Sequence, residues 1–163
     1  MNPQLKKLIE WLNKIAGQRL TGVLALIYVY DDREDNNSPQ AIYLEFDNNL
    51  HGCVRCASDG ESIEYDSNAP AEIDLGRYGN EILKYISNQG PWRECVGEKL
   101  NDSFVLIADN NVCMGVRLLF QSGKSVDIVN LGDELYVYDF LPESIVAEEH
   151  IETKRINSNM TNI

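Results

Sequence analysis

The sequence predicts one α+β domain built from antiparallel strand meanders. A chain of 163 residues is near the common size of a single domain and can bury a full core without disulfides or metal. Its apolar fraction of 44% lies in the range of globular proteins. An amphipathic segment opens the chain, and short apolar segments separated by turn residues follow it. We therefore expect about eight strands, in one or two antiparallel sheets, with two helices that cover an open face.

The first half of the chain predicts one helix followed by a strand meander. Apolar residues recur at helical spacing over residues 3–16, between Asn2 as a cap and Gly17 as a stop. Residues 20–30 are rich in Val, Leu, Ile and Tyr and predict a strand buried on both faces. Polar turns then separate three further expected strands, at 41–46, 50–57 and 62–66.

The second half is expected to repeat this order. Apolar residues on one helical face predict a helix near 77–88; they are Tyr78, Ile82, Tyr85 and Ile86. Four strands should follow, at 103–109, 114–121, 124–130 and 134–140. The links between the strands are too short for parallel crossovers, which predicts antiparallel pairing throughout. Five side chains should point into the core: Val116, Leu118, Phe120, Val126 and Ile128. The domain is expected to span 1–146, and 147–163 to form a polar, frayed tail.

No export or membrane signal is visible in the chain. Charged residues interrupt the apolar positions of the first twenty residues, so we expect no secretory leader. The longest apolar run, 22–30, is much shorter than the roughly 20 residues that cross a bilayer. These features predict a cytoplasmic protein that does not enter a membrane, and its cysteines are expected to be reduced.

The four cysteines are candidates for metal ligands or redox-active thiols. Cys53 and Cys56 form a Cys-x-x-Cys pair next to His51, but residues three apart on a strand point to opposite faces. Structural zinc needs four ligands, and Cys95 and Cys113 stand alone in the sequence. We therefore expect small buried hydrophobic residues here, and no metal or other cofactor.

Motifs of enzyme families are missing as well. The segment Gly123-Lys-Ser125 resembles the end of a phosphate-binding loop, but Leu118 occupies the position of that motif's first glycine. The chain has only two histidines, His51 and His150, and neither lies in a context typical of a catalytic triad. A hydrolase that uses a carboxylate pair stays open as an alternative, because such pairs meet only in three dimensions. We expect a binding protein rather than an enzyme.

Charge is the most informative feature of the composition. The net charge is −12, and residues 31–74 contain twelve acids against two bases, whereas the first twenty residues are basic. Such a field repels nucleic acids and anionic lipids and attracts basic proteins. A concentrated acidic surface speeds association with a cationic partner and can imitate a phosphate backbone. The alternative is that the acids serve only solubility.

The expected contact surface is the acidic stretch together with two tyrosines. Its acids lie in loops and at strand ends, so we expect them to share an edge or a face. The predicted contact residues are Asp31, Asp32, Glu34, Asp35, Tyr43, Glu45, Asp47, Asp59, Glu61, Glu64, Tyr65 and Asp66. A second acidic group on the other meander is the alternative binding face: Asp133, Glu134 and Asp139.

The last third of the chain resembles small bacterial proteins that include immunity proteins of contact-dependent growth inhibition and other polymorphic toxin systems. The residues that carry the resemblance are Pro91-Trp-Arg-Glu-Cys-Val-Gly97, Gly115-Val-Arg-Leu-Leu-Phe120, Gly123 and Asn130-Leu-Gly-Asp-Glu-Leu135. The resemblance implies a cytoplasmic protein that binds a cognate toxin domain and blocks its active site or its access to substrate. An inhibitor of a basic nuclease would use an acidic surface of this kind. The alternatives are an adaptor for another basic partner and the hydrolase considered above.

Overall fold

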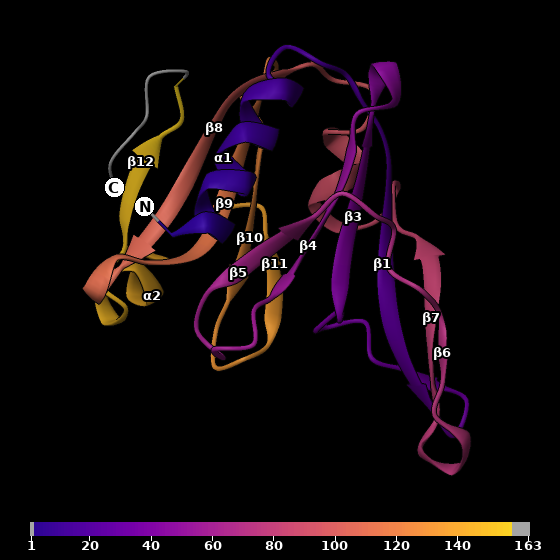
Figure 1. The fold of residues 1–163 in the computed structure, drawn as a ribbon. Coiled ribbons are helices and arrows are strands. Elements are labelled where there is room, and N and C mark those ends of the chain that lie inside the picture. Colours follow the sequence, from indigo (N-terminus) through magenta and orange to yellow (C-terminus); the bar gives the residue numbers. More distant parts are fainter. Residues whose placement is uncertain (1, 158–163) are drawn as a thin grey trace.

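Two antiparallel sheets face each other across a shared core in the computed structural model, which describes residues 2–157 (Figure 1). The larger sheet has the strand order β5-β4-β3-β1-β7-β6, and the short β2 pairs with the end of β1. The smaller sheet has the order β11-β10-β9-β8-β12. The predicted α+β class with antiparallel sheets is confirmed, and every strand pair is antiparallel, among them β1 with β3, β8 with β9 and β9 with β10.

The chain passes through these elements in one order. The larger sheet comprises β1 (Leu20–Tyr30), β2 (Arg33–Glu34), β3 (Ala41–Phe46), β4 (His51–Cys56), β5 (Ile63–Asp66), β6 (Ile73–Asp74) and β7 (Asn80–Tyr85). The smaller sheet comprises β8 (Leu100–Ala108), β9 (Val112–Phe120), β10 (Ser125–Asn130), β11 (Leu135–Tyr138) and β12 (Glu152–Arg155). The α-helices are α1 (Pro3–Ile15) and α2 (Glu143–Glu148), and short 3₁₀ turns include η1 (Asp47–Asn49), η2 (Gly76–Tyr78), η3 (Gly90–Glu94) and η4 (Asp109–Asn111). Neither α-helix in the described part of the chain has the length and apolar character needed to cross a membrane.

The first helix and the strand registers follow the predicted pattern. Asn2 caps α1 by accepting a hydrogen bond from the Gln4 N–H, and the apolar stripe of α1 is buried in the core. β1 is buried on both faces, with Val23 in the central core and Leu26 on the outer side of the sheet. The five core residues predicted for β9 and β10 are all buried: Val116, Leu118, Phe120, Val126 and Ile128. The predicted register of this hairpin is therefore confirmed.

The helix predicted near 77–88 is wrong, because this segment contains β7. Gly79 has a φ of 101° that no helix adopts, and β7 pairs along the free edge of β1 from Leu24 to Val29. Ile82 packs against the central core while Leu83 packs on the outer side of the sheet, which is the alternation of a strand. Hydrogen bonds to β1 thus override a local sequence pattern that fits a helix equally well.

The frayed tail predicted from residue 147 is also wrong over its described part. Residues 143–148 form α2, whose Ile145 and Val146 pack on the outer face of the smaller sheet. β12 then pairs with β8, from Glu152 opposite Ile107 to Arg155 opposite Phe104. The backbone of β8 offers a free edge here, so a polar segment gains order by hydrogen bonding rather than by burial of apolar side chains. The rest of the predicted tail, 158–163, lies outside the described residues.

A six-residue strap, residues 67–72, crosses the outer face of the larger sheet. It links β5 at one edge with β6 at the other, five strand spacings of about 4.8 Å away, or about 24 Å (Figure 1). The seven steps from Asp66 to Ile73 span about 23–25 Å when extended, so the strap must be almost fully extended. Pro70 in its centre is buried, and the Glu72 carboxylate accepts a hydrogen bond of 3.0 Å from the Leu83 N–H. Cys53 is fully buried on the same outer face of the sheet.

A buried ion pair closes the outer side of the smaller sheet. Asp127 of β10 is fully buried and accepts two hydrogen bonds from Arg117 of β9, at 2.7 and 2.9 Å. It also accepts the Leu141 N–H at 2.8 Å, which holds the chain between β11 and α2 against the sheet. The guanidinium of Arg117 stacks against the exposed ring of Phe140. The carboxylate therefore has partners on both of its oxygens, as a buried charge requires.

We expect Asp127→Ala to lower the free energy of unfolding by about 3–5 kcal/mol, because it leaves a half-buried guanidinium and a buried N–H without their acceptor. Glu94→Ala is the control, since Glu94 pairs with Lys124 where both side chains are exposed. Its effect should stay below about 1 kcal/mol. Urea unfolding of both variants measures the difference, and equal midpoints would show that the buried pair contributes nothing.

Candidate functional site

Carboxylates from both sheets meet at one end of the molecule. The β4–β5 loop carries Asp59 and Glu61, and the β10–β11 turn carries Asp133 and Glu134. A methyl group placed on Gly60 would lie 3.7 Å from the Asp133 carboxyl carbon, so the two loops are in contact. Burial raises the pKa of the Cys56 thiol to about 11, and the negative charges of Asp133, Glu134 and Asp59 add to this effect. The acids of the two meanders therefore form one negative region.

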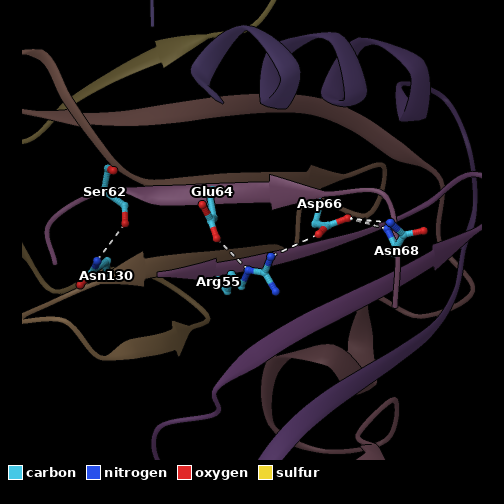
Figure 2. A network of polar contacts seen from close by, with 6 residues as sticks. All are labelled: Arg55, Ser62, Glu64, Asp66, Asn68 and Asn130. Atoms are coloured by element: carbon cyan, nitrogen blue, oxygen red, sulfur yellow. Dashed lines mark hydrogen bonds and ion pairs between the residues drawn. The ribbon is translucent and has the colours of Figure 1, made fainter. Parts of the chain in front are cut away.

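Asn130 holds the two loops together. Its side chain is buried at the end of β10, and its Nδ2 donates a hydrogen bond of 2.9 Å to the Ser62 carbonyl oxygen in the other sheet (Figure 2). Its Oδ1 accepts the Asp133 N–H at 3.0 Å, which fixes the β10–β11 turn. Asp59 organises the β4–β5 loop by accepting hydrogen bonds from the backbone N–H of Glu61 and Ser62. Both acidic loops thus have a defined backbone.

The same loops border a hollow of about 410 Å³. Four carboxylates from three segments line it: Glu61, Asp109, Glu148 and Glu149. Its floor includes the buried Met114 and the half-buried Val112 and Leu131, and His150 lies at its rim. Among the described residues, neither Lys nor Arg lines this hollow. We call the hollow, with Asp59, Asp133 and Glu134 beside it, the acidic end. A cationic side chain with a long aliphatic stem suits a site of this composition.

The structure divides the predicted acidic stretch among several places. Asp59 and Glu61 lie at the acidic end, and Asp35 is close enough to contribute to the raised pKa of Tyr136 on β11, whose main cause is a hydrogen bond to Glu134. Asp47 belongs to η1, which joins β3 to β4 at the opposite end of the sheet from the β4–β5 loop (Figure 1). The expectation that the acids of this stretch share one edge or one face is therefore wrong, because successive turns of an antiparallel meander lie at alternate ends.

The remaining predicted contact residues lie on the larger sheet and its hairpin turn. Asp31 and Asp32 form the two-residue β1–β2 turn with positive φ, and Glu34 pairs with Lys84 at 2.8 Å. Arg55 of β4 bridges Glu64 at 2.8 Å and Asp66 at 3.2 Å across β5, as Figure 2 shows. Glu34, Glu64 and Asp66 already pair with a cation of this chain, so they gain less from pairing with a cation of another protein.

Three aromatic or polar side chains of the predicted surface have structural roles. Tyr65 stacks on Trp11 with ring centroids 4.9 Å apart and packs against the central core, so it is not an exposed anchor. Tyr43 lies on the outer face, where burial raises its pKa. Glu45 accepts a hydrogen bond from the Tyr85 hydroxyl, which raises the pKa of Tyr85. Asp109, Glu148 and Glu149 were not among the predicted contact residues, although Pro142 and Glu143 before Ile145-Val146 are typical of a helix start.

The cysteines have the environment of buried hydrophobic residues. Cys53 packs on the outer side of the larger sheet and Cys56 against the central core, so the predicted divergence of the pair is confirmed. Burial raises the pKa of Cys53 and Cys95 to about 11 and that of Cys113 to about 12. Within residues 2–157, no three His, Cys, Asp or Glu side chains are placed to hold a metal ion.

Comparison of the chain with protein-family models, with curated proteins and with solved structures finds no match.

We expect Asn130→Ala to lower the free energy of unfolding by about 2 kcal/mol, because it removes two hydrogen bonds between buried or half-buried groups. Asn101→Ala is the matched control, since the exposed Asn101 bonds only to its neighbour Asp102. Chemical denaturation compares the two. A loss at Asn130 no greater than at Asn101 would mean that this bridge does not hold the acidic loops together.

The thiols should react slowly in the folded protein. With a pKa of about 11, a thiol at pH 8 contains about 200-fold less thiolate than an unperturbed cysteine. The unfolded chain loses these protons near pH 9 while the folded chain keeps them, so the free energy of unfolding should fall as the pH rises from about 9 to 11. Labelling with a thiol-reactive disulfide, with and without denaturant, tests the first point; rapid labelling of the native chain would contradict it.

Proposed function

We propose that this chain is an immunity-type binding protein that neutralises a basic cognate toxin domain, such as a nuclease. Its acidic end would cover the active site of that domain or block its access to substrate. The observation that carries the proposal is the convergence of carboxylates from the β4–β5 loop, η4 and the end of α2 on one hollow, with the acids of the β10–β11 turn beside it. These groups come from distant parts of the chain, and a uniformly charged, solubilising surface would not require them to converge.

The chemistry of the acidic end fits a basic partner. Loop carboxylates held in a fixed arrangement can take the place of the phosphates that a nuclease normally binds. The half-apolar floor of the hollow suits the aliphatic stem of a Lys or Arg side chain, while the rim carboxylates pair with its charge. A negative field of this size also repels nucleic acid, so the chain would compete with the substrate rather than bind it.

Two alternatives use the same surface. An adaptor for another basic protein would need the same charge, and the identity of the partner separates it from an immunity protein. A hydrolase would use the carboxylates of the hollow on a small substrate. The immunity proposal alone predicts that the basic domain encoded directly before this chain's gene loses its activity in a one-to-one complex with this chain.

The test replaces three exposed carboxylates of the hollow, Glu61→Lys, Glu148→Lys and Glu149→Lys, in one variant. Binding to the basic domain encoded directly before the gene is followed by stopped flow at 50 and 200 mM salt. We expect association at low salt to slow by at least about tenfold and its salt dependence to weaken, because rate enhancement of this kind is electrostatic.

The matched control reverses three exposed acids that do not line the hollow: Glu10→Lys, Asp47→Lys and Glu94→Lys. It changes the net charge by the same amount, so it should slow association by less than about threefold if position matters. Equal slowing by both variants would mean that the net charge of the chain, and not the position of the acidic end, determines the rate of association. Absence of a complex with the unaltered chain would refute the proposed function itself.

A further inference from the structure

An exposed apolar corner lies at the far edge of the larger sheet. Six large hydrophobic side chains are exposed among the described residues, and four of them come from the end of β1 and from the β6–β7 hairpin. These four form what we call the hairpin patch: Tyr30 at 55% exposed, Ile73 at 45%, Leu75 at 39% and Tyr78 at 61%. Tyrosine and aliphatic side chains grouped in this way are typical of contact surfaces rather than of scattered surface residues.

The hairpin that carries the patch is rigidly attached. The Tyr28 hydroxyl donates a hydrogen bond to the Tyr78 carbonyl oxygen, which fixes η2 to β1. A methyl group at Gly79 would lie 2.2 Å from the Val29 carbonyl oxygen, so the two backbones are in closer contact than any other residue would permit. The guanidinium of Arg77 lies 4.8 Å from the centre of the Tyr78 ring and donates to its hydroxyl. A surface held in this way loses little entropy when a partner binds.

Charge around the patch determines the kind of partner. Five carboxylates and two cations surround it, which leaves three negative charges; they are Asp31, Asp32, Glu72, Asp74 and Glu81 against Arg33 and Arg77. Asp31 and Asp32 line one hollow together with Gly76 and Arg77, so the β1–β2 turn lies directly beside the hairpin. A second copy of this chain, with its net charge of −12, would bring like charges together. A basic partner would not.

One short segment lies between the patch and the acidic end. The segment from Asp31 to Asp35 begins beside the hairpin, and the charge of Asp35 makes a small contribution to the raised pKa of Tyr136 on β11. In Figure 1 the hairpin of β6 and β7 lies at the lower right, whereas the β4–β5 loop and the β10–β11 turn lie towards the lower left. The proposed partner would span this lower side of the molecule to touch the patch and the acidic loops together.

We propose that the hairpin patch is the apolar anchor for the same basic partner, and that it receives an apolar side chain of that partner flanked by Lys or Arg. This inference rests on the proposed function. Apolar and aromatic anchors at the centre of a contact surface control how long a complex lasts, whereas charges around it control how fast it forms. The two parts of the surface should therefore differ in their kinetic effect.

The test uses Leu75→Ser with Tyr78→Ser in one variant and Phe140→Ser as the control. Phe140 is 60% exposed, much like Tyr78, but lies on the smaller sheet. The probe is again the basic domain encoded directly before the gene. We expect the patch variant to dissociate about 30-fold faster, with association and its salt dependence within twofold of the unaltered chain. The control should change dissociation by less than threefold.

The outcomes separate this inference from the proposed function. If the unaltered chain binds and the patch variant dissociates at the same rate, the anchor role is refuted while the proposed function stands. If the unaltered chain binds nothing, both are refuted. Light scattering of the chain alone is the second measurement: a dimer that the patch variant abolishes would identify a second copy as the occupant and overturn the inference.

Discussion

The free edge of β1 is the constraint on which the larger sheet depends. β1 is buried on both faces and pairs with β3 along one edge, so its other edge must also be hydrogen-bonded. β7 fills that edge, but the chain reaches it from β5 on the far side of the sheet. The strap 67–72 is the consequence, and its Glu72 is hydrogen-bonded to the Leu83 N–H of β7. The β6–β7 hairpin then extends beyond the sheet, which explains why its apolar side chains are exposed.

The two halves of the chain fill the free edge of their first strand in a related way. Each half contains a four-strand meander, β1-β3-β4-β5 and β8-β9-β10-β11, and in each a later strand returns to the free edge of the first. The halves meet twice. Backbone hydrogen bonds join Gly17–Leu20 to Gly97–Leu100 at one end, and the side chain of Asn130 reaches Ser62 near the other. The acidic end thus arises where the third turn of one meander meets the third turn of the other.

The features predicted correctly from the sequence are those that short-range patterns determine. Alternating apolar residues gave the register of β9 and β10, and Asn48-Asn49 marked the turn of η1 because asparagine tolerates positive φ. β7 was mistaken for a helix because Tyr78, Ile82 and Tyr85 recur at helical spacing, although Ile82 and Tyr85 lie on opposite faces of the strand; the vacant edge of β1 is what favours the strand. β12 is polar and carries no periodic signal. Asp109 and Glu149 could not be placed at the acidic end, because their positions depend on how distant loops meet.

Charge and apolar contact act over different distances, and this chain separates them in space. Carboxylates at the acidic end attract a cation across about 10 Å of salt solution, but each exposed pair that finally forms contributes little free energy. Tyr30 and Tyr78 contribute only on direct contact, when their rings bury a large apolar area. A partner drawn by the first surface and retained by the second would bind both fast and for long. The 31–35 segment lies between the two surfaces: its first two acids border the hairpin, and the charge of Asp35 makes a small contribution to the raised pKa of Tyr136 on β11. Substitutions there should alter the approach of the proposed partner without altering the contact that would retain it.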